Sequence, residues 1–450
     1  MPENQDSGLR VGTLHYRSLG KLIEAGAYLM LALLATNLMG YKLYSTLLPL
    51  LLDKQGFTSS RIALIMSTIP SMLTFVICPI ISTASDKTRT RFGRRMPYLA
   101  ISAPVVTLFL MLIPWSGQIA ALFPGEPPKA TAILMATLTF CFQVAFLIPG
   151  SVLYYVAADI IPHDHVGRFT AVSSILGTGL TALFNYCLLK RCVENPRLWF
   201  TVIGGLFLMA TWLLCLRVKE GEYPPVEDNP QDSSNALGNF PAYIRLYFRE
   251  CYSHPLYVLL FLGAALNQAS TVCRNTFNLL FATKSLKMDA GQYGKVIGVG
   301  AVLSALMLLP LGRLMDRIHP LRMYIVSGIV VVAVNAWGYF FVHSYQTFYV
   351  IGVMISLVYA IQNMAGTPML ICLVPTDKYG QFASANSMVN CLVMFPASYL
   401  GGVVIEHLGY QMIFAWDFLV TILATIAMLC VYRSWQKLGG PHSYSPPRNF

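Results

Sequence analysis

The chain alternates between long apolar segments and short polar ones. Twelve of the apolar segments hold about 20 residues or more, which is enough to cross a bilayer at about 1.5 Å of rise per helical residue. They lie at 23–51, 61–84, 97–117, 131–157, 168–189, 198–217, 255–283, 291–312, 321–342, 347–374, 381–404 and 411–432. The pattern predicts an all-α polytopic membrane protein with twelve transmembrane helices in two sets of six.

A polar segment separates the two sets. Residues 218–254 include Pro224-Pro225 and a serine-containing acidic run, which is typical of a flexible linker. Near its end, Ile244, Tyr247, Phe248 and Cys251 recur at helical spacing opposite charged residues, which predicts a short amphipathic helix on the membrane interface. We therefore expect an N-terminal tail at 1–22, a six-helix bundle at 23–217, a central loop at 218–254, a second six-helix bundle at 255–433 and a C-terminal tail at 434–450.

The composition supports a membrane protein. Hydrophobic residues make up 56% of the chain and charged residues 11%, whereas soluble domains carry about 25% charged residues. The net charge of +11 fits basic cytoplasmic loops and requires no nucleic-acid partner. The ten cysteines form no Cys-x-x-Cys pair, so we interpret them as small apolar residues. The triplet His163-Asp164-His165 has no further ligand nearby in the sequence, and neither a metal nor another cofactor is expected.

The basic residues predict the orientation. Ser85–Tyr98 carries five of them between two apolar segments, and each such charge would cost about 2.5–3.5 kcal/mol at the bilayer centre. Most of the 31 Lys and Arg residues lie on the same side as this segment, which marks that side as cytoplasmic. An even number of spans then places both termini in the cytoplasm of a multi-pass protein of the plasma or inner membrane. Met1–Gly20 lacks the apolar core of a cleavable signal peptide.

Matching residues recur in the two sets of helices. Asp86 and Asp316 are 230 positions apart, and so are Asn37 and Asn267. The pattern Pro-x-Asp-x-x-Gly-x-Phe follows the fourth span at 162–169 and the tenth span at 375–382. Several such matches at corresponding places predict a duplicated protein with two pseudo-symmetric bundles.

The basic segment resembles a signature of the major facilitator superfamily. Its long form is similar to that of the glycoside–pentoside–hexuronide:cation symporters and of the related proton-coupled sucrose transporters. The matching residues are Asp86, Thr88, Arg89, Arg91, Phe92, Gly93, Arg94, Pro97 and Tyr98, while Met96 stands where an arginine is usual. The resemblance covers the whole chain and implies the major facilitator fold, with transport of a sugar or glycoside by alternating access.

The resemblance also implies a cytoplasmic gate. Asp86 and Asp316 would face the N-termini of the eleventh and fifth spans, where free N–H groups and the helix dipole favour a carboxylate. Such a latch would break in every transport cycle. The candidate gate residues are Asp86, Arg89, Gly93, Arg94, Arg95, Asp159, Arg168, Asp316 and Arg317.

The sequence departs from this family in its buried acids. Melibiose-type members carry carboxylates on the first, second and fourth spans, but 61–84 and 131–157 contain no Asp or Glu here. A sodium site is therefore not supported, and a proton is the expected coupling ion. Asp417 is the acidic residue well inside a span and is the candidate to carry that proton, with capping or pairing near the outer helix end as its alternative. A facilitator without a coupling ion is the alternative mechanism.

Polar residues at helical spacing mark the expected substrate cavity. Amides and phenols suit a neutral polyol because they form directional hydrogen bonds. The alternative is bonding between helices, worth about 0.6 kcal/mol for each bond. Arg274 could bind an anionic substrate such as a hexuronide or pair with a carboxylate, and the alternative is that its side chain reaches the outer water. The candidate cavity residues are Asn37, Tyr41, Tyr44, Gln143, Asn267, Thr271, Arg274, Asn278, Tyr359, Gln362, Asn363, Asn386 and Asn390.

Other classes of function fit the sequence poorly. A membrane enzyme needs titratable groups that converge inside the membrane, and the spans hold no such cluster. A nutrient sensor usually carries an added soluble domain, and both tails are short. We therefore expect a monomeric secondary transporter whose partners are the bilayer and a sugar or glycoside, with another small polar or anionic solute as the alternative substrate.

Overall fold

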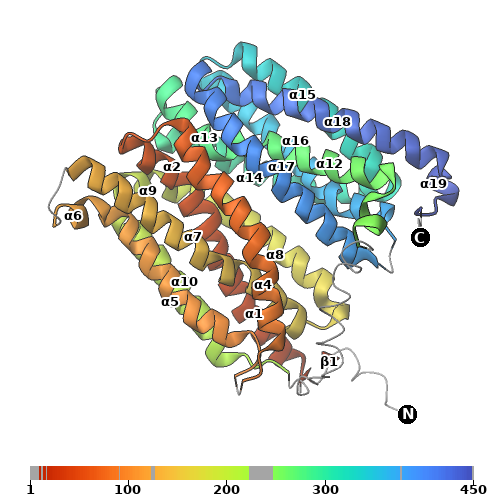
Figure 1. The fold of residues 1–450 in the computed structure, drawn as a ribbon, viewed down its shortest axis with the longest axis horizontal. Helices are drawn as coiled ribbons and strands as arrows, with labels where there is room; N and C mark the ends of the chain where they lie inside the picture. The colour runs from red at the N-terminus through yellow and green to blue at the C-terminus, as the bar shows by residue number, and fades with distance from the viewer. Residues whose placement is uncertain are drawn as a thin grey trace. The chain divides into compact units, whose positions relative to one another are not determined.

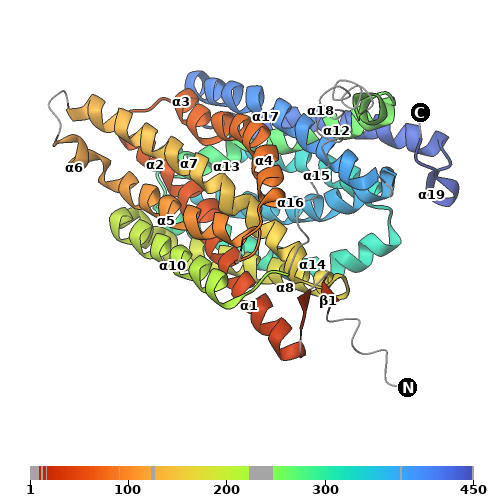
Figure 2. The ribbon, with the colours of Figure 1, turned by 60° about the horizontal axis from the view of Figure 1, so that its bottom comes forward.

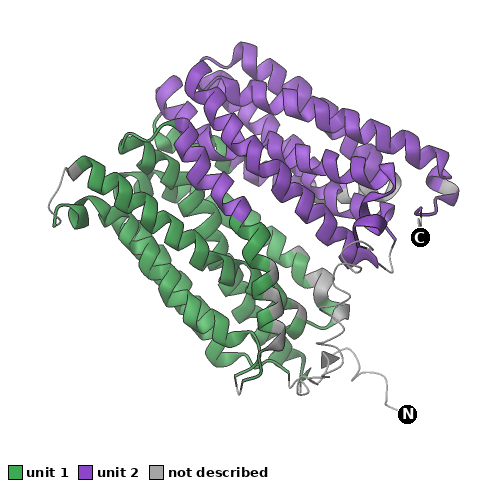
Figure 3. Cartoon of the chain, in the orientation of Figure 1, with its two compact units in different colours: residues 1–58, 73–226, 289–298 green, residues 59–72, 227–288, 299–450 purple. Residues whose placement is uncertain are grey.

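The computed structural model describes residues 10–11, 14–16, 18–90, 92–122, 127–221, 247–375 and 378–447. It divides into two compact units, shown in Figure 3. Unit 1 comprises residues 1–58, 73–226 and 289–298, and unit 2 comprises residues 59–72, 227–288 and 299–450. The predicted boundaries of the tails and the central loop stay predictions.

Unit 1 is built from long helices and one short hairpin (Figure 1). Strands β1 (Arg10–Val11) and β2 (Leu14–His15) pair in antiparallel register. The helices are α1 (Leu19–Thr36), η2 (Asn37–Tyr44), α2 (Ser45–Lys54), α4 (Ile69–Lys87), α5 (Met96–Leu112), η4 (Ile113–Trp115), α6 (Ser116–Ala120), α7 (Pro127–Ile160), α8 (His163–Leu183), η5 (Phe184–Leu188), α9 (Leu189–Glu194) and α10 (Pro196–Arg217). Helices α1, η2 and α2 form one continuous span over Leu19–Lys54.

Unit 2 is also helical. Its elements are α3 (Ser59–Ala63), η3 (Leu64–Thr68), a helical turn at 247–252, α12 (Pro255–Ser270), α13 (Val272–Leu280), η6 (Phe281–Ser285), α14 (Ala290–Arg317), α15 (Pro320–Phe341), α16 (Tyr345–Leu373), α17 (Tyr379–Leu408), α18 (Met412–Lys437) and α19 (Gly440–Ser443). The first residues of α14 belong to unit 1, and the first residues of α4 belong to unit 2.

Two helices of unit 2 begin in the same way. Pro255 and Pro320 occupy the first turns of α12 and α15, where a missing N–H costs nothing. The histidine before each proline accepts a hydrogen bond through Nδ1, from the Leu256 N–H at 3.2 Å and from the Leu321 N–H at 3.3 Å. These local signals set the start of both helices, close to the predicted starts at 255 and 321.

Each unit has an apolar core of its own. Leu29, Leu99 and Val156 lie fully buried in the core of unit 1. Phe261 and Met428 lie fully buried in the core of unit 2. Lipid tails are as apolar as these side chains, so such helices are held together mainly by close packing and by interhelical hydrogen bonds.

Short stretches near the ends of two spans pack on helices from the other half of the sequence. Within unit 2, α3 lies along α17, as Figure 2 shows, and the Ser60 N–H donates to Glu406 Oε2 at 3.0 Å. Gly402 of α17 faces Ser59 and Ala63 so closely that a Cβ atom would overlap with them. Within unit 1, Gly294 of α14 approaches the carbonyl oxygen of Asn185 with equally little space. Glycines thus allow the close helix approach at both places.

The helices agree with the predicted all-α membrane architecture. Within the described ranges, eleven helical segments are long and apolar enough to cross a membrane. Helix α14 is not among the eleven, although its 28 residues would span about 42 Å. Apart from the short β1–β2 hairpin, a multi-pass helical membrane protein is therefore confirmed, whereas the count of twelve spans stays a prediction.

Candidate functional site: an amide-lined cavity and a buried ion pair

Amide side chains line a cavity of about 200 Å³ inside unit 2. They come from three helices, α12, α16 and α17, and the tyrosines of α15 and α17 add hydroxyl groups. The polar residues around the cavity are Asn267, Gln268, Tyr324, Gln362, Asn363, Thr367, Tyr379, Asn386 and Asn390. None of these lining residues carries a charge, so the cavity suits a neutral ligand.

Four of these amides have buried carbonyl oxygens with no hydrogen-bond partner among the described residues. They belong to Asn267, Gln362, Asn386 and Asn390. Leaving a buried acceptor unsatisfied costs about 1–3 kcal/mol, so buried polar groups almost always find a partner. Their clustering leaves four hydrogen-bond acceptors around one cavity, where a bound molecule with several donors could satisfy them. Hydroxyl groups of a polyol are such donors.

A second polar cluster in unit 2 is fully paired. Arg274 of α13 donates through Nε to Asp417 Oδ2 of α18 at 2.7 Å, and its NH2 nitrogen lies 2.7 Å from the same oxygen. Asn335 of α15 accepts a short hydrogen bond from Arg274, and Tyr359 of α16 donates one to Asp417 Oδ1. Asp417 is wholly buried. The cluster therefore ties together four helices.

This pairing changes the interpretation of Arg274. Its guanidinium is engaged by Asp417 and Asn335, and it lies 5.1 Å from the centre of the Phe414 ring. A buried charge needs a partner of opposite sign, and Asp417 supplies it. Arg274 is thus bound to a carboxylate in this structure, and a role in binding an anionic substrate stays a prediction without support from the geometry.

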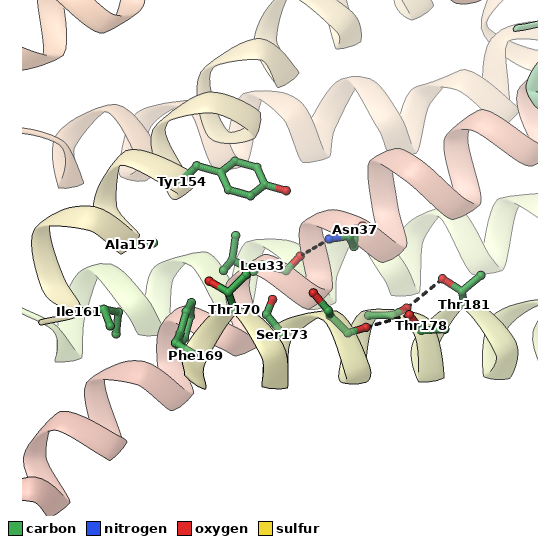
Figure 4. Close-up of a pocket in the computed structure, with 12 residues that line it drawn as sticks. Leu33, Asn37, Tyr154, Ala157, Ile161, Phe169, Thr170, Ser173, Thr178 and Thr181 are labelled. Atoms are coloured by element: carbon green, nitrogen blue, oxygen red, sulfur yellow. Dashed lines mark hydrogen bonds between the residues drawn. The ribbon is translucent and has the colours of Figure 1, made fainter. Parts of the chain in front are cut away.

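Unit 1 contains a larger cavity of about 810 Å³ (Figure 4). Figure 4 shows Tyr154 of α7 and Asn37 of η2 on one part of its wall and hydroxyl groups of α8 on another. Asn37 Nδ2 donates to the Leu33 carbonyl at 3.4 Å, which leaves its side-chain oxygen for other partners. The α8 residues are Thr170, Ser173, Ser174, Thr178 and Thr181.

The other residues of the predicted stripe in the first span lie elsewhere. Tyr44 is buried and forms a short hydrogen bond with Gln143 of α7. Tyr41 is about half exposed and meets Phe146 edge-on. In unit 2, Thr271 donates to the Gln268 carbonyl at 2.9 Å, and Asn278 is buried in α13. Neither cavity includes these side chains in its lining, and substrate contact by them stays a prediction.

Residues of the predicted gate form a compact charged cluster in unit 1. Arg94 NH2 lies 2.7 Å from Asp159 Oδ1, and Arg95 NH1 lies 3.0 Å from Asp159 Oδ2. Glu220 adds a second carboxylate: it accepts hydrogen bonds from the backbone N–H groups of Arg94 at 2.7 Å, of Arg95 at 3.1 Å and of Met96 at 3.0 Å. Two arginines thus meet two acids at the start of α5.

Glu220 also explains a glycine in the basic segment. Gly93 has a φ of +107°, a backbone conformation that L side chains rarely adopt. A Cβ atom there would lie 2.7 Å from a carboxylate oxygen of Glu220. Burial raises the pKa of Glu220, and the hydrogen bonds from the backbone N–H groups act in the opposite direction. The sequence places Glu220 in the central loop and gives no signal for this role.

Among the remaining gate residues, the structure describes the side chain of Arg89. Arg89 is exposed, and its guanidinium donates to the Thr88 carbonyl at 2.9 Å. The side chains of Asp86, Arg168, Asp316 and Arg317 lie outside the described residues, as does Ile244 of the predicted amphipathic helix. The proposed latch therefore stays a prediction.

Comparison with known proteins decides the family. A family model described as "MFS/sugar transport protein" matches residues 29–431, which is most of the chain. The chain belongs to this family. Two solved transporters share the fold of this transporter at 12% sequence identity. A bacterial homologue of the human lysosomal transporter Spinster has a TM-score of 0.66, covering 96% of this chain and 100% of that chain. A D-xylose–proton symporter has a TM-score of 0.61, covering 92% and 96%. Such likeness shows the fold alone. Members of the MFS/sugar transport family are transporters and not enzymes.

Curated relatives match parts of the transporter. Solute carrier family 45 member 3 of Mus musculus is 35% identical over 105 residues, which is 22% of this chain and 19% of the relative. The general alpha-glucoside permease of Schizosaccharomyces pombe is 26% identical over 163 residues, which is 34% of this chain and 30% of the relative. The alignments thus span less than a third of either relative. The resemblance of the sequence to major facilitator sugar transporters is confirmed.

The helical turn at 247–252 docks on the transporter's α17. Glu250 accepts hydrogen bonds from Lys378 Nζ at 2.8 Å and from Gln381 Nε2 at 2.9 Å. The Tyr252 hydroxyl donates to the Ala385 carbonyl at 3.0 Å. The Lys378 and Gln381 contacts lower the pKa of Glu250. The end of the central loop is thereby fixed to the beginning of α17.

This contact predicts a pH-dependent contribution to stability. The folded pKa of Glu250 lies below its ordinary value, so its stabilisation is present above about pH 4.5 and is lost as the pH falls through the lower folded pKa. We expect the melting temperature of the wild type to fall more steeply below about pH 4.5 than that of Glu250→Gln, measured by tryptophan fluorescence in detergent. Equal slopes of melting temperature against pH for the wild type and Glu250→Gln would show that the contact does not contribute to stability. Exposed Glu194→Gln is the matched control and should behave as the wild type.

Proposed function

We propose that this protein transports a neutral sugar or glycoside by alternating access, in symport with protons. The observation that carries the proposal is the cavity in unit 2, where four unsatisfied amide oxygens surround an uncharged space. Membership of the MFS/sugar transport family supports the same substrate class.

The chemistry of the cavity favours a polyol over an ion. Amide groups donate and accept directional hydrogen bonds, which match hydroxyl groups. Tyr324 and Tyr379 add ring surfaces against which the apolar faces of a sugar can pack. An anionic sugar would need a free cation, but Arg274 is already paired with Asp417. The S. pombe relative is named an alpha-glucoside permease, so α-glucosides are the first substrates to test.

The proposal includes the coupling of sugar transport to protons and the location of the protein in the membrane. Symport with protons needs a carboxylate that can bind and release a proton within the membrane, and the wholly buried Asp417 is the candidate for it. The protein would act as a monomer in the plasma or inner membrane, with both termini in the cytoplasm. A facilitator without a coupling ion is the alternative within the same family.

Reconstituted protein tests the substrate and the coupling together. Proteoliposomes are offered radiolabelled maltose, sucrose, glucose and glucuronate, with and without an inward proton gradient and with and without sodium. We expect saturable uptake of at least one neutral sugar, and accumulation above equilibrium with the proton gradient alone. Equilibration to the same sugar level with and without the proton gradient would identify a facilitator. Transport of glucuronate without any neutral sugar would overturn the substrate class.

Removing one amide of the cavity tests the binding site. Gln362 is 2% exposed and lines the cavity on α16. A hydrogen bond to a neutral group contributes about 0.5–1.5 kcal/mol, so Gln362→Ala should raise the half-saturating sugar concentration about 2- to 12-fold. Initial rates of uptake over a range of sugar concentrations measure it. The exposed Asn275→Ala on α13 is the control and should leave this concentration unchanged. Equal behaviour of the two variants would place the substrate elsewhere.

A further inference from the structure

A tyrosine near each end of the chain bonds to the last residue of a long helix. In unit 1, the Tyr16 hydroxyl donates to the carbonyl oxygen of Ile160, the last residue of α7, at 3.1 Å. In unit 2, the Tyr444 hydroxyl donates to the carbonyl oxygen of Leu373, the last residue of α16, at 2.6 Å. The final carbonyls of a helix have no intrahelical partner, so a hydroxyl group from outside the helix can satisfy them.

The two carbonyls occupy corresponding positions of the internal repeat. Ile160 and Leu373 are 213 positions apart, and so are Pro162 and Pro375, which follow them. Ile160 and Leu373 are both fully buried. Each helix ends before its proline because the residue that precedes a proline disfavours the helical conformation. The repeat therefore produces the same buried helix end in both units, and a different end of the chain bonds to each.

Tyr16 fixes the chain just before α1 to the end of α7. It is 8% exposed and belongs to the apolar core of unit 1. Burial raises the pKa of Tyr16 to about 12, so its hydroxyl keeps the proton that it donates at neutral pH. Helix α1 begins at Leu19, three residues later, and Ile161 lines the larger cavity directly after the acceptor residue. The contact thus joins two helices of that cavity at one of their ends.

In unit 2 the C-terminal segment makes the equivalent connection with two bonds. The hydroxyl of Tyr257, in the first turn of α12, donates to the Pro447 carbonyl at 2.9 Å. Together with the bond to the end of α16, it ties the start of α12 to α16 through the C-terminal segment. Leu260 and Leu370 lie one helical turn from these two contacts and line the amide cavity.

A turn with two glycines brings the chain back from α18 to α16. Helix α18 ends at Lys437, and Gly439 and Gly440 follow with φ values of +107° and +57°. L side chains rarely adopt these conformations, and a Cβ atom at Gly439 would lie 2.4 Å from the Ser443 carbonyl oxygen. The short helix α19, labelled beside the C-terminus in Figure 1, follows the turn. Tyr444 then packs against the apolar core of unit 2.

We propose that the two chain ends form paired clamps: Tyr16 holds α7 beside α1, whereas Tyr444 and Tyr257 hold α16 beside α12. Each clamp positions the helices that line the cavity of its own unit. In unit 2 the clamp thereby sets the spacing of the amides that would bind the sugar, and this part of the inference rests on the proposed function.

Removal of single hydroxyl groups tests the clamps without any substrate. Tyr16→Phe and Tyr444→Phe keep the aromatic rings, and Tyr186→Phe and Tyr399→Phe, at exposed tyrosines, are the matched controls. Backbone amides in the last turns of α7 and α16 should exchange about 2- to 12-fold faster in the respective variant, which corresponds to a hydrogen bond of about 0.5–1.5 kcal/mol. Hydrogen exchange with mass spectrometry measures these rates in detergent. Exchange as slow as in the control variants would overturn the clamp of that unit.

A cross-effect distinguishes a clamp from two separate contacts in unit 2. Tyr444→Phe should also accelerate exchange in the second turn of α12, although Tyr444 bonds to α16, because both bonds are needed to join the two helices. Adding Tyr257→Phe should then change little, and a chain that ends at Ser443 should behave as this double variant. Effects that stay in one helix each and add up in the double variant would overturn the clamp of unit 2.

Uptake into proteoliposomes connects this clamp with sugar binding. Tyr444→Phe should raise the half-saturating sugar concentration about 2- to 12-fold and leave the maximal rate within about twofold, because it loosens the binding site. Tyr399→Phe should leave both unchanged. A lower maximal rate with an unchanged half-saturating concentration would overturn the positioning of the amides by the clamp. If the wild type transports no sugar, the proposed function fails, while the exchange rates still decide whether the clamps exist.

Discussion

Replacing Arg274 with methionine is expected to destabilise the protein by about 3–5 kcal/mol, because the change leaves the buried Asp417 carboxyl without its cation. The side-chain oxygen of Asn335 would also lose the hydrogen bond that it accepts from Arg274. Methionine approximates the apolar volume of the arginine stem, so the loss reflects the charge and not a cavity. The melting temperature of the purified protein in detergent measures the effect.

A second variant gives this prediction its control. Arg274→Met combined with Asp417→Leu removes both charges, and replacement of a buried ion pair by apolar residues is often neutral or even stabilising. We therefore expect the double variant to melt near the wild type, well above Arg274→Met alone. A double variant as unstable as the single one would show that packing around the arginine, rather than the unpaired charge, holds α13 in place.

The ion pair shows what the sequence could not reveal. Arg274 and Asp417 stand 143 positions apart, and each allows several interpretations by itself. For Arg274 the choice between an anionic substrate, a carboxylate and the outer water depends on which helices are neighbours. Asp417 was expected either to carry a proton inside its span or to cap or pair near the outer helix end, and the structure buries it completely and pairs it with Arg274. Tertiary contacts determine both roles.

Hydrophobic patterning was sufficient for the architecture. The first predicted span, 23–51, falls within the observed Leu19–Lys54, and the predicted 198–217 nearly coincides with α10. Apolar length is a property of local sequence, so such spans can be recognised without knowledge of neighbours. The interruption at Thr271 was not predicted, because Gln268–Val272 contains no glycine or proline.

The two cavities were predictable to different degrees. Gln362, Asn363, Asn386 and Asn390 were recognisable because amides in an apolar span are costly unless they face the interior. The serine and threonine residues of α8 were missed. Their hydroxyls bond to the preceding turn of their own helix, as Thr178 does to the Ser174 carbonyl at 2.8 Å, so they cost little anywhere in a span. Their recurrence on one face of α8 was the available signal.

Glu220→Ala is expected to lower stability by about 3 kcal/mol and to disorder the basic segment that begins α5. The carboxylate accepts hydrogen bonds from three consecutive backbone N–H groups. A hydrogen bond to a charged acceptor contributes about 1.5–3 kcal/mol, and in the variant water takes over part of these bonds. Its loss also leaves Arg94 and Arg95 with Asp159 as the remaining acid of the cluster. Melting temperature and the rate of proteolysis near Arg94 both report the change.

A graded series isolates the contribution of the charge. Glu220→Gln keeps an oxygen acceptor for the start of α5 and removes the negative charge, so its loss of stability should be about half that of Glu220→Ala. Gly93→Ala tests the same contact from the other side, because the added methyl group meets the carboxylate and a φ of +107° strains any L residue. If Glu220→Gln is as stable as the wild type, the backbone hydrogen bonds account for the stabilisation and the negative charge of Glu220 adds nothing. If Glu220→Ala is also as stable as the wild type, Glu220 does not hold the basic segment, and Arg94, Arg95 and Asp159 alone determine its structure.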